Sequence, residues 1–372
     1  MWKIIVAFCI FCLVLFIYLH VQFHLKTSND LEVYELEQGS KDKLEEICDL
    51  RQPVIMNFYN DPILQGTKRS HILANYHAFE MKVRNSKEHD YSNEIYMPLQ
   101  AHSTFKLFDD DKNSSYITEN NQEFLQETGI HKIIQSNDEF IRPNLVSNCI
   151  YDIFAGSENA TTIFRNEINY RNYFFVTNGT VEIKLSPPKS AKYLHPIDDY
   201  DNFEFRSPIN PWVVQQEYKY DFDKIKCMDV LLPAGKMIHI PAYWWYSIKF
   251  CKDATMVSFK YRTYMNNVAI LPHIGLNILQ MQNVQHDIIK KYDGVRRNGF
   301  EKEENREKED ICEEEKEKEK EKEKEKEETE IGVTLIQDLS TTPTLNELPD
   351  VNAFVCSDII SAANASGIVN MQ

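Results

Sequence analysis

Histidine, cysteine and acidic residues at ligand spacing are the side chains of this sequence that could bind a metal. Cys9 and Cys12 have the C-x-x-C spacing of a zinc site, but they lie in an apolar run. Zinc would need further ligands nearby and a polar environment around them. His131, His273 and His286 have no partner at ligand spacing. We therefore expect none of these five residues to form a metal site.

The sequence also lacks the glycine motifs that bind phosphates. It contains 11 glycines and no G-x-G-x-x-G, G-x-x-x-x-G-K-[ST] or G-x-S-x-G motif, so dinucleotide-binding, P-loop and hydrolase-elbow functions are unsupported. The formal charge of −16 argues against a nucleic-acid partner, because binding to phosphates needs a basic face. Residues 301–330, with 17 acidic and nine basic residues, contribute half of this charge.

Two segments have the pattern of strands joined by turns. The run YFFVTNGTVEIKL (173–185) has two apolar stretches around Asn178-Gly179, which predicts a β-hairpin. The run LLPAGKMIHIPAYWWYSIKF (231–250) has a glycine turn, an apolar strand, a bend and two tryptophans. Further short strand-like runs with turn signals favour an antiparallel sandwich or barrel over a βαβ array.

These segments resemble the conserved strands of JmjC-type, cupin-like oxygenases. Segment 172–188, with NYFF, a glycine and LSPP, is similar to an early hairpin of that family, and segment 231–250 is similar to its second conserved strand. Pro53-Val-Ile resembles the opening of these domains. The resemblance implies a mainly β fold with flanking helices, namely a double-stranded β-helix (a cupin or jelly-roll barrel) with a pocket between its sheets.

Active members of this family hold Fe(II) with an H-x-D/E pair and a distal histidine, which leaves sites for 2-oxoglutarate and oxygen. Counted back from the glycine and prolines of the first segment, the resemblance places the first two ligand positions at Asn166 and Ile168. It places the distal histidine at Tyr246, directly after the two tryptophans of the second segment. It places the lysine that grips 2-oxoglutarate at Val181. None of these four side chains suits that chemistry. Residues 132–194 contain no histidine, so a small shift does not supply the first ligand.

Two other histidines lie near these segments. His195 and Asp198 form H-P-I-D, which has the wrong spacing and follows the first segment instead of preceding it. We expect a loop element there. His239 lies seven residues before Tyr246. This offset places the two residues on opposite faces of an uninterrupted strand, so we expect His239 to be a structural or a surface histidine.

The missing ligands predict a catalytically inactive oxygenase relative that uses no cofactor and acts as a binding or scaffolding module. Its candidate pocket is lined by Asn166, Ile168, Val181 and Tyr246, and its ligand is an unknown protein or small molecule. The alternative is an Fe(II)/2-oxoglutarate-dependent oxygenase, a hydroxylase or demethylase, with displaced ligands. That alternative requires His, Asp or Glu side chains that converge inside the barrel from elsewhere in the chain.

An apolar run near the N-terminus predicts a membrane anchor. Residues 4–23, IIVAFCIFCLVLFIYLHVQF, would span roughly 30 Å as a helix, which matches the hydrocarbon core of a bilayer. No small-residue cleavage site follows, which favours a single-pass anchor over a signal peptide, with a buried helix as a third interpretation. The short N-terminal flank places the body on the lumenal or extracellular side. Candidate glycosylation sites are Asn113, Asn159, Asn178 and Asn364.

We therefore expect four regions. They are a transmembrane anchor (1–26), a stalk (27–50) with a short helix around Ser40–Leu50, a cupin-like domain (51–292), and a charged, disordered tail (293–372). Amphipathic helices are predicted over 267–292, with Pro272 as a start or break and Gly294 as a stop. Short anchored cupin-like proteins of this kind resemble ones of large DNA viruses, so the membrane is a viral or a host one.

Overall fold

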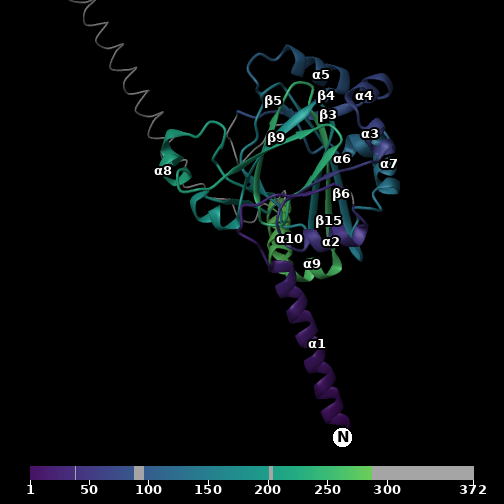
Figure 1. Cartoon of the computed structure of the whole chain (residues 1–372), viewed down its shortest axis with the longest axis vertical. Coiled ribbons are helices and arrows are strands. Elements are labelled where there is room, and N and C mark those ends of the chain that lie inside the picture. Colours follow the sequence, from purple (N-terminus) through teal and green to yellow (C-terminus); the bar gives the residue numbers. More distant parts are fainter. Residues whose placement is uncertain (38, 88–95, 201–203, 287–372) are drawn as a thin grey trace, which may run out of the picture. The chain divides into compact units, whose positions relative to one another are not determined.

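The computed structural model describes residues 1–37, 39–87, 96–200 and 204–286. The predicted tail, the Asn364 sequon and the expected helix stop at Gly294 lie outside these residues. The described chain is mixed α/β, with two largely antiparallel sheets and helices on both sides of the strands (Figure 1). The expectation of a mainly β chain is therefore corrected, because much of the segment between residues 61 and 137 is helical.

The larger sheet has nine strands in the order β1-β2-β13-β8-β15-β6-β5-β3-β4. Its only parallel pair among the described strands is β1 with β2. The strands are β1 (Tyr34–Leu36), β2 (Val54–Asn57), β3 (Glu80–Asn85), β4 (Met97–Gln100), β5 (Tyr116–Thr118), β6 (Val146–Gly156), β8 (Arg171–Asn178), β13 (Lys236–His239) and β15 (Thr255–Thr263).

The smaller sheet has six strands in the order β10-β11-β7-β14-β9-β12, all antiparallel. They are β7 (Arg165–Asn166), β9 (Thr180–Ser186), β10 (Ile197–Asp199), β11 (Glu204–Arg206), β12 (Met228–Pro233) and β14 (Trp245–Phe250). Short helices lie in its connections, namely η1 (Pro188–Tyr193), η2 (Gln216–Tyr218) and α8 (Lys219–Phe222).

The predicted turn at Asn178-Gly179 forms, but the strands on either side of it enter different sheets. β8 pairs with β13 and β15, whereas β9 pairs with β12 and β14. The predicted hairpin is therefore wrong, because a turn signal fixes a change of chain direction and not the partners of the strands. Gly179 has φ +67°, and a Cβ there would lie 2.7 Å from the Lys252 carbonyl oxygen, so the turn requires glycine.

Apolar side chains of both sheets meet in one cluster, which we call the inter-sheet core. It contains alternate residues of the strands, such as Phe174 and Val176 of β8, and it is continuous from one sheet to the other. The neighbouring residues Tyr173 and Phe175 face a second core on the outer side of the larger sheet. The members of the inter-sheet core from the six-stranded sheet are Val181, Ile183, Leu185, Val230, Leu232, Tyr246, Ile248 and Phe250.

Helices cover the outer face of the nine-stranded sheet and complete the second core. Figure 1 shows α3, α4, α6 and α7 gathered on one side of the strands. The helices that contribute buried residues are α2 (Lys41–Cys48), α3 (Asp61–Gly66), α4 (Arg69–Asn75), α5 (Ala101–Asp110), α6 (Gln122–Glu127) and α7 (Ile130–Asn137).

The two ends of the described chain are helical. The apolar run lies in α1 (Trp2–Leu25), which is long and apolar enough to cross a membrane and is exposed along most of that run. The expected short helix forms as α2, and the Ser40 side chain caps it by accepting from the Lys43 amide at 3.3 Å. Leu36 and Leu44, within the segment expected as a stalk, are buried in the second core.

The helices expected after the last strand also form. They are α9 (Tyr264–Ala269) and α10 (Leu271–His286), which are separated at Ile270. Pro272 lies in the first turn of α10, where its missing amide hydrogen leaves no helical bond unmade. The prediction of a start or break at Pro272 is therefore confirmed.

Candidate functional site

The four residues predicted to line the pocket lie in different environments. Val181 of β9 and Tyr246 of β14 are buried together in the inter-sheet core. Ile168 is buried in a separate small cluster with Phe205. Asn166 is half-buried and pairs with Phe205 across β7 and β11. The structure therefore brings Val181 and Tyr246 into one cluster and places Ile168 in another.

Arg165 and Glu167, on either side of Asn166, face Tyr246. Arg165 is the register partner of Tyr246 across β7 and β14, and partners in an antiparallel ladder share a face. The Tyr246 hydroxyl donates to Glu167 Oε1 at 3.1 Å. A displacement of one residue along a strand exchanges its two faces. Counting along the sequence could not resolve that displacement, so it missed Arg165 and Glu167.

Six charged side chains gather beside Tyr246, and we call them the charged cluster. They come from strands of both sheets and from the segments that directly follow β5 and β7, and they are linked by ion pairs and by shared electrostatic neighbours. The members are Arg84, Glu119, Asp152, Arg165, Glu167 and Lys260.

Glu119 is the most buried carboxylate of the charged cluster, with 2% of its side chain exposed. Arg84 Nε donates to its Oε1 at 2.5 Å, and Arg165 Nη1 donates to its Oε2 at 2.7 Å. Burial alone would raise the pKa of Glu119, but Arg165, Arg84 and Arg206 hold it well below its ordinary value. Glu119 therefore stays ionised at neutral pH and holds two guanidinium groups in place.

Glu167 is engaged through both of its oxygens. Oε1 accepts from Lys260 Nζ at 2.6 Å as well as from Tyr246, and Oε2 accepts from Asn169 Nδ2 at 3.0 Å. Burial and the adjacent Glu167 carboxylate raise the pKa of Tyr246 well above its ordinary value. The phenol is therefore a protonated donor.

Asp152 of β6 is a carboxyl group held by backbone amides. Its two oxygens accept from the amides of Asn120 and Asn121 at 2.8 and 2.7 Å. Burial raises the pKa of Asp152 to about 6, although these hydrogen bonds and the Lys260 ammonium act in the opposite direction. Asp152 therefore changes charge within the range in which many proteins work.

The side chains beside Tyr246 do not fit ferrous iron. A facial triad needs two neutral imidazoles and a carboxylate with free lone pairs. Here the carboxylate of Glu167 is paired with Lys260, the Arg165 guanidinium has no lone pair to offer, and the Tyr246 phenol keeps its proton. Among the residues that the structure describes, no three or more His, Cys, Asp and Glu side chains are grouped to hold a metal ion.

The structure places the two histidines near the conserved segments, His239 and His195, away from the inter-sheet core. His239 of β13 is buried, with its ring 5.1 Å from that of Tyr173, on the face opposite to the inter-sheet core. His195 follows η1, its Nε2 lies 3.0 Å from Asp221 Oδ2, within hydrogen-bond distance, and half of its side chain is exposed. His239 is therefore a buried and not a surface residue, and His195 lies in a loop as expected.

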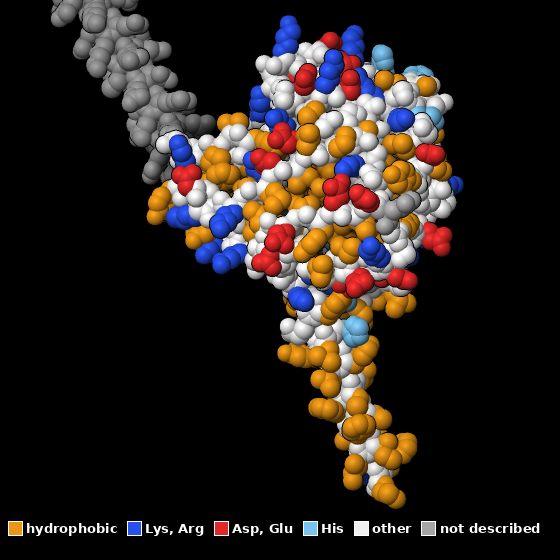
Figure 2. All heavy atoms as spheres, viewed as in Figure 1, with side chains coloured by type: hydrophobic (Ala, Val, Ile, Leu, Met, Phe, Trp, Pro, Cys, Tyr) orange, Lys and Arg blue, Asp and Glu red, His pale blue; other side chains and the backbone are white. Residues whose placement is uncertain are grey.

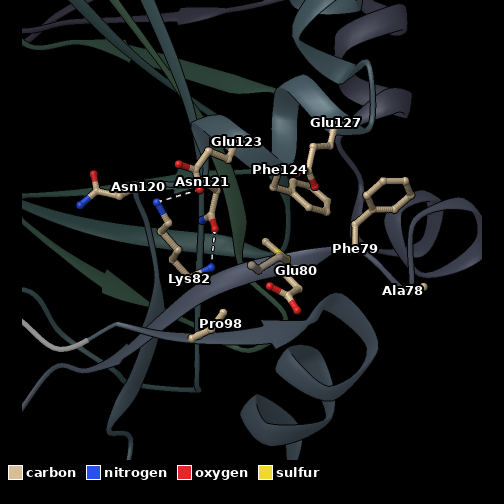
Figure 3. Close-up of a pocket in the computed structure, with 11 residues that line it drawn as sticks. Ala78, Phe79, Glu80, Lys82, Pro98, Asn120, Asn121, Glu123, Phe124 and Glu127 are labelled. Carbon is tan, nitrogen blue, oxygen red and sulfur yellow. Dashed lines mark hydrogen bonds and ion pairs between the residues drawn. The ribbon is translucent and has the colours of Figure 1, made fainter.

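Two cavities open outside the inter-sheet core. The larger, of about 280 Å³, lies between β3, β4 and α6, and none of the charged cluster lines it (Figure 3). Its wall carries Glu80, Glu123 and Glu127, and Lys82 Nζ lies 3.1 Å from Glu123 Oε2. The second, of about 250 Å³, lies beside β2 and includes Met56 in its wall.

A comparison with models of protein families gives a match. Residues 23–267 match the model of a family described as "Cupin-like domain". The match begins in the last turn of α1 and ends within α9, so it includes both sheets and the whole charged cluster. Among curated proteins, none matches the sequence significantly.

Proposed function

The chain belongs to the cupin-like domain family, and on this premise we propose that it is a membrane-anchored, catalytically inactive relative of Fe(II)/2-oxoglutarate-dependent oxygenases that acts as a binding or scaffolding module. One observation carries the proposal. The Glu167 carboxylate, beside Tyr246, is paired with the Lys260 ammonium at 2.6 Å. A carboxylate whose oxygens already accept from a cation and a phenol has little to gain from a metal ion.

In this proposal the family's H-x-D/E pair corresponds to Arg165 and Glu167, and its distal histidine to Tyr246. Support comes from the pairing of Arg165 with Tyr246 and from the hydrogen bond between Tyr246 and Glu167. The positions counted from the sequence, Asn166 and Ile168, differ from these by one residue. With either assignment, no imidazole occupies a ligand position.

Lys260 has a defined role in this account. In an active enzyme the metal ion supplies the positive charge that offsets the carboxylate. Here the ammonium of Lys260, with 19% of its side chain exposed, faces Glu167, of which 14% is exposed. An ion pair of this kind is stable only when further hydrogen bonds complete it, and Tyr246 and Asn169 provide them. The ion pair between Lys260 of β15 and Glu167, which follows β7, thereby joins the two sheets.

The position assigned to the 2-oxoglutarate lysine also has another role. Val181 is fully buried in the inter-sheet core and pairs with Leu232 and Phe250 on the neighbouring strands. An apolar side chain there offers no charge to a carboxylate. In this proposal Val181 therefore takes no part in binding 2-oxoglutarate.

The test of inactivity uses the full-length chain in detergent micelles. The protein is incubated with Fe(II), 2-oxoglutarate, ascorbate and oxygen, and the succinate formed is measured. We expect no more succinate than in protein-free buffer. Succinate formation that is lost in a Glu167→Ala variant would overturn the proposal and support an oxygenase with rearranged ligands.

A further inference from the structure

The end of α1 is fixed to the body through buried contacts. His24 is only 8% exposed, and its Nε2 lies 3.4 Å from Thr263 Oγ1, within hydrogen-bond distance. Its ring centroid lies 5.0 Å from that of Tyr170. Arg51 Nη2 donates to the carbonyl of Phe23 at 3.2 Å. The helix therefore leaves the body in a direction that these contacts set.

Exposed apolar side chains lie on the body next to this attachment. Thr263 is the N-cap of α9, and α9 contacts α1. α9 and the first turn of α10 expose three apolar side chains at spacings of four and three residues, and a neighbouring loop exposes Leu145, whose carbonyl accepts from the Tyr264 amide at 3.2 Å. We call these residues the basal patch: Leu145, Tyr264, Val268 and Leu271.

The contacts of α1 with the body determine how deep the basal patch would lie in a bilayer that α1 spans. Val21 belongs to the apolar run but is half-buried, so the body reaches back beside the last turn of that run. Three residues, from Val21 to His24, correspond to roughly 5 Å along a helix axis. A body that contacts the final turn of a spanning helix lies in the headgroup region, where tyrosines such as Tyr264 are enriched.

We propose that the basal patch is embedded in the headgroup region of the bilayer that α1 spans. The body would then be held by two contacts, and the orientation of the inter-sheet core relative to the membrane would be fixed. The inference rests on the anchoring part of the proposed function. Its physical argument is proximity: α1 exposes apolar side chains along its length, as Figure 2 shows, and α9, which contacts α1, exposes Tyr264 and Val268. Leu145 is 76% exposed, which is costly for a leucine in water beside other apolar residues.

The test compares three tyrosines of the full-length chain in phosphatidylcholine nanodiscs. 4-Trifluoromethylphenylalanine replaces Tyr264, Tyr59 or Tyr18, one at a time, and fluorine relaxation is measured with doxyl-labelled phosphatidylcholine and with a water-soluble gadolinium chelate. The side chains of Tyr264 and Tyr59 are 64% and 79% exposed. Tyr59 lies beyond the end of β2 that is remote from Arg51, so it is the control for an exposed tyrosine in water. Tyr18 lies within α1 and reports on anchoring itself.

We expect the doxyl lipid to broaden the signals at Tyr18 and Tyr264 several-fold more than the signal at Tyr59, and the chelate to do the reverse. A Tyr264 signal that behaves like that of Tyr59, while the lipid still reaches Tyr18, overturns the proposal and leaves the anchor intact. A Tyr264 signal protected from both reagents also overturns it, because another segment or a second copy then covers the basal patch. If the lipid does not reach Tyr18, the anchoring premise itself fails.

Discussion

The Tyr246 hydroxyl donates to Glu167 at 3.1 Å, from a strand whose register partner at this point is Arg165. This contact joins β14, which carries Tyr246, to the segment with Glu167 that follows β7. The Glu167 carboxylate is thereby bound to a tyrosine and, through Lys260 Nζ at 2.6 Å, to a cation. Beside Tyr246 the side chains of Glu167, Lys260 and Asn169 thereby form a network of hydrogen bonds and an ion pair.

Removing the charge of Glu167 should destabilise the protein more than removing the phenol. Tyr246→Phe deletes one hydrogen bond and should lower the free energy of unfolding by about 1 kcal/mol. Glu167→Gln leaves the Lys260 ammonium partly buried without its carboxylate and should cost about 3 kcal/mol. Urea unfolding of the full-length chain in micelles measures both. Glu182→Gln, which removes a more exposed partner of Lys249, is the control and should cost under about 1 kcal/mol. Equal losses at Glu167 and Glu182 would contradict the role given to the charged cluster.

Asp152 should make stability depend on pH. Its pKa is about 6 in the folded chain, against roughly 3.9 when unfolded, so the folded state binds more protons between these values. The stability that this group contributes is therefore complete at low pH and falls as pH rises from about 4 to 6. The unfolding free energy of the wild type relative to Asp152→Asn should fall by at most about 3 kcal/mol between pH 4 and 7. A difference that stays constant across this range, or rises, would contradict the prediction.

Two glycines test the turn between the sheets. Gly235 has φ +91°, and a Cβ added there would have no atom within 4 Å. Gly235→Ala should therefore lower the free energy of unfolding only by the conformational strain, about 1 kcal/mol. At Gly179 a Cβ would lie 2.7 Å from a backbone oxygen, so Gly179→Ala also forces the backbone to move. We expect a clearly larger loss at Gly179 in the same urea titration. Similar losses would mean that the contact with Lys252 does not restrict this turn.

A lumenal body should carry glycans at two sites. Asn113 and Asn159 are exposed, whereas Asn178 is half-buried and its Nδ2 donates to the Asp253 carbonyl at 2.7 Å. Glycosidase treatment of the chain from eukaryotic cells should increase its mobility, and Asn113→Gln and Asn159→Gln should each remove one step. Mobility that glycosidase leaves unchanged would place the body on the cytosolic side.

The sequence predicted the elements better than their partners. The apolar run of α1, the turn at Gly179 and the helix break before Pro272 each depend on neighbouring residues, so local patterns were sufficient. The pairing of β8 and β9 with different sheets depends on strands far along the chain. The face that points inward at Arg165–Asn166 was not readable, because a strand of two residues has no alternation to count.

The iron content of the purified full-length chain tests the central claim most directly. It is measured after expression with iron, for the wild type and for a variant with Arg165→His, Tyr246→His and Lys260→Met. This variant retains Glu167 and restores two imidazoles beside it. We predict that the wild type holds far less than stoichiometric iron and that the variant gains iron. Near-stoichiometric iron in the wild type would contradict the account.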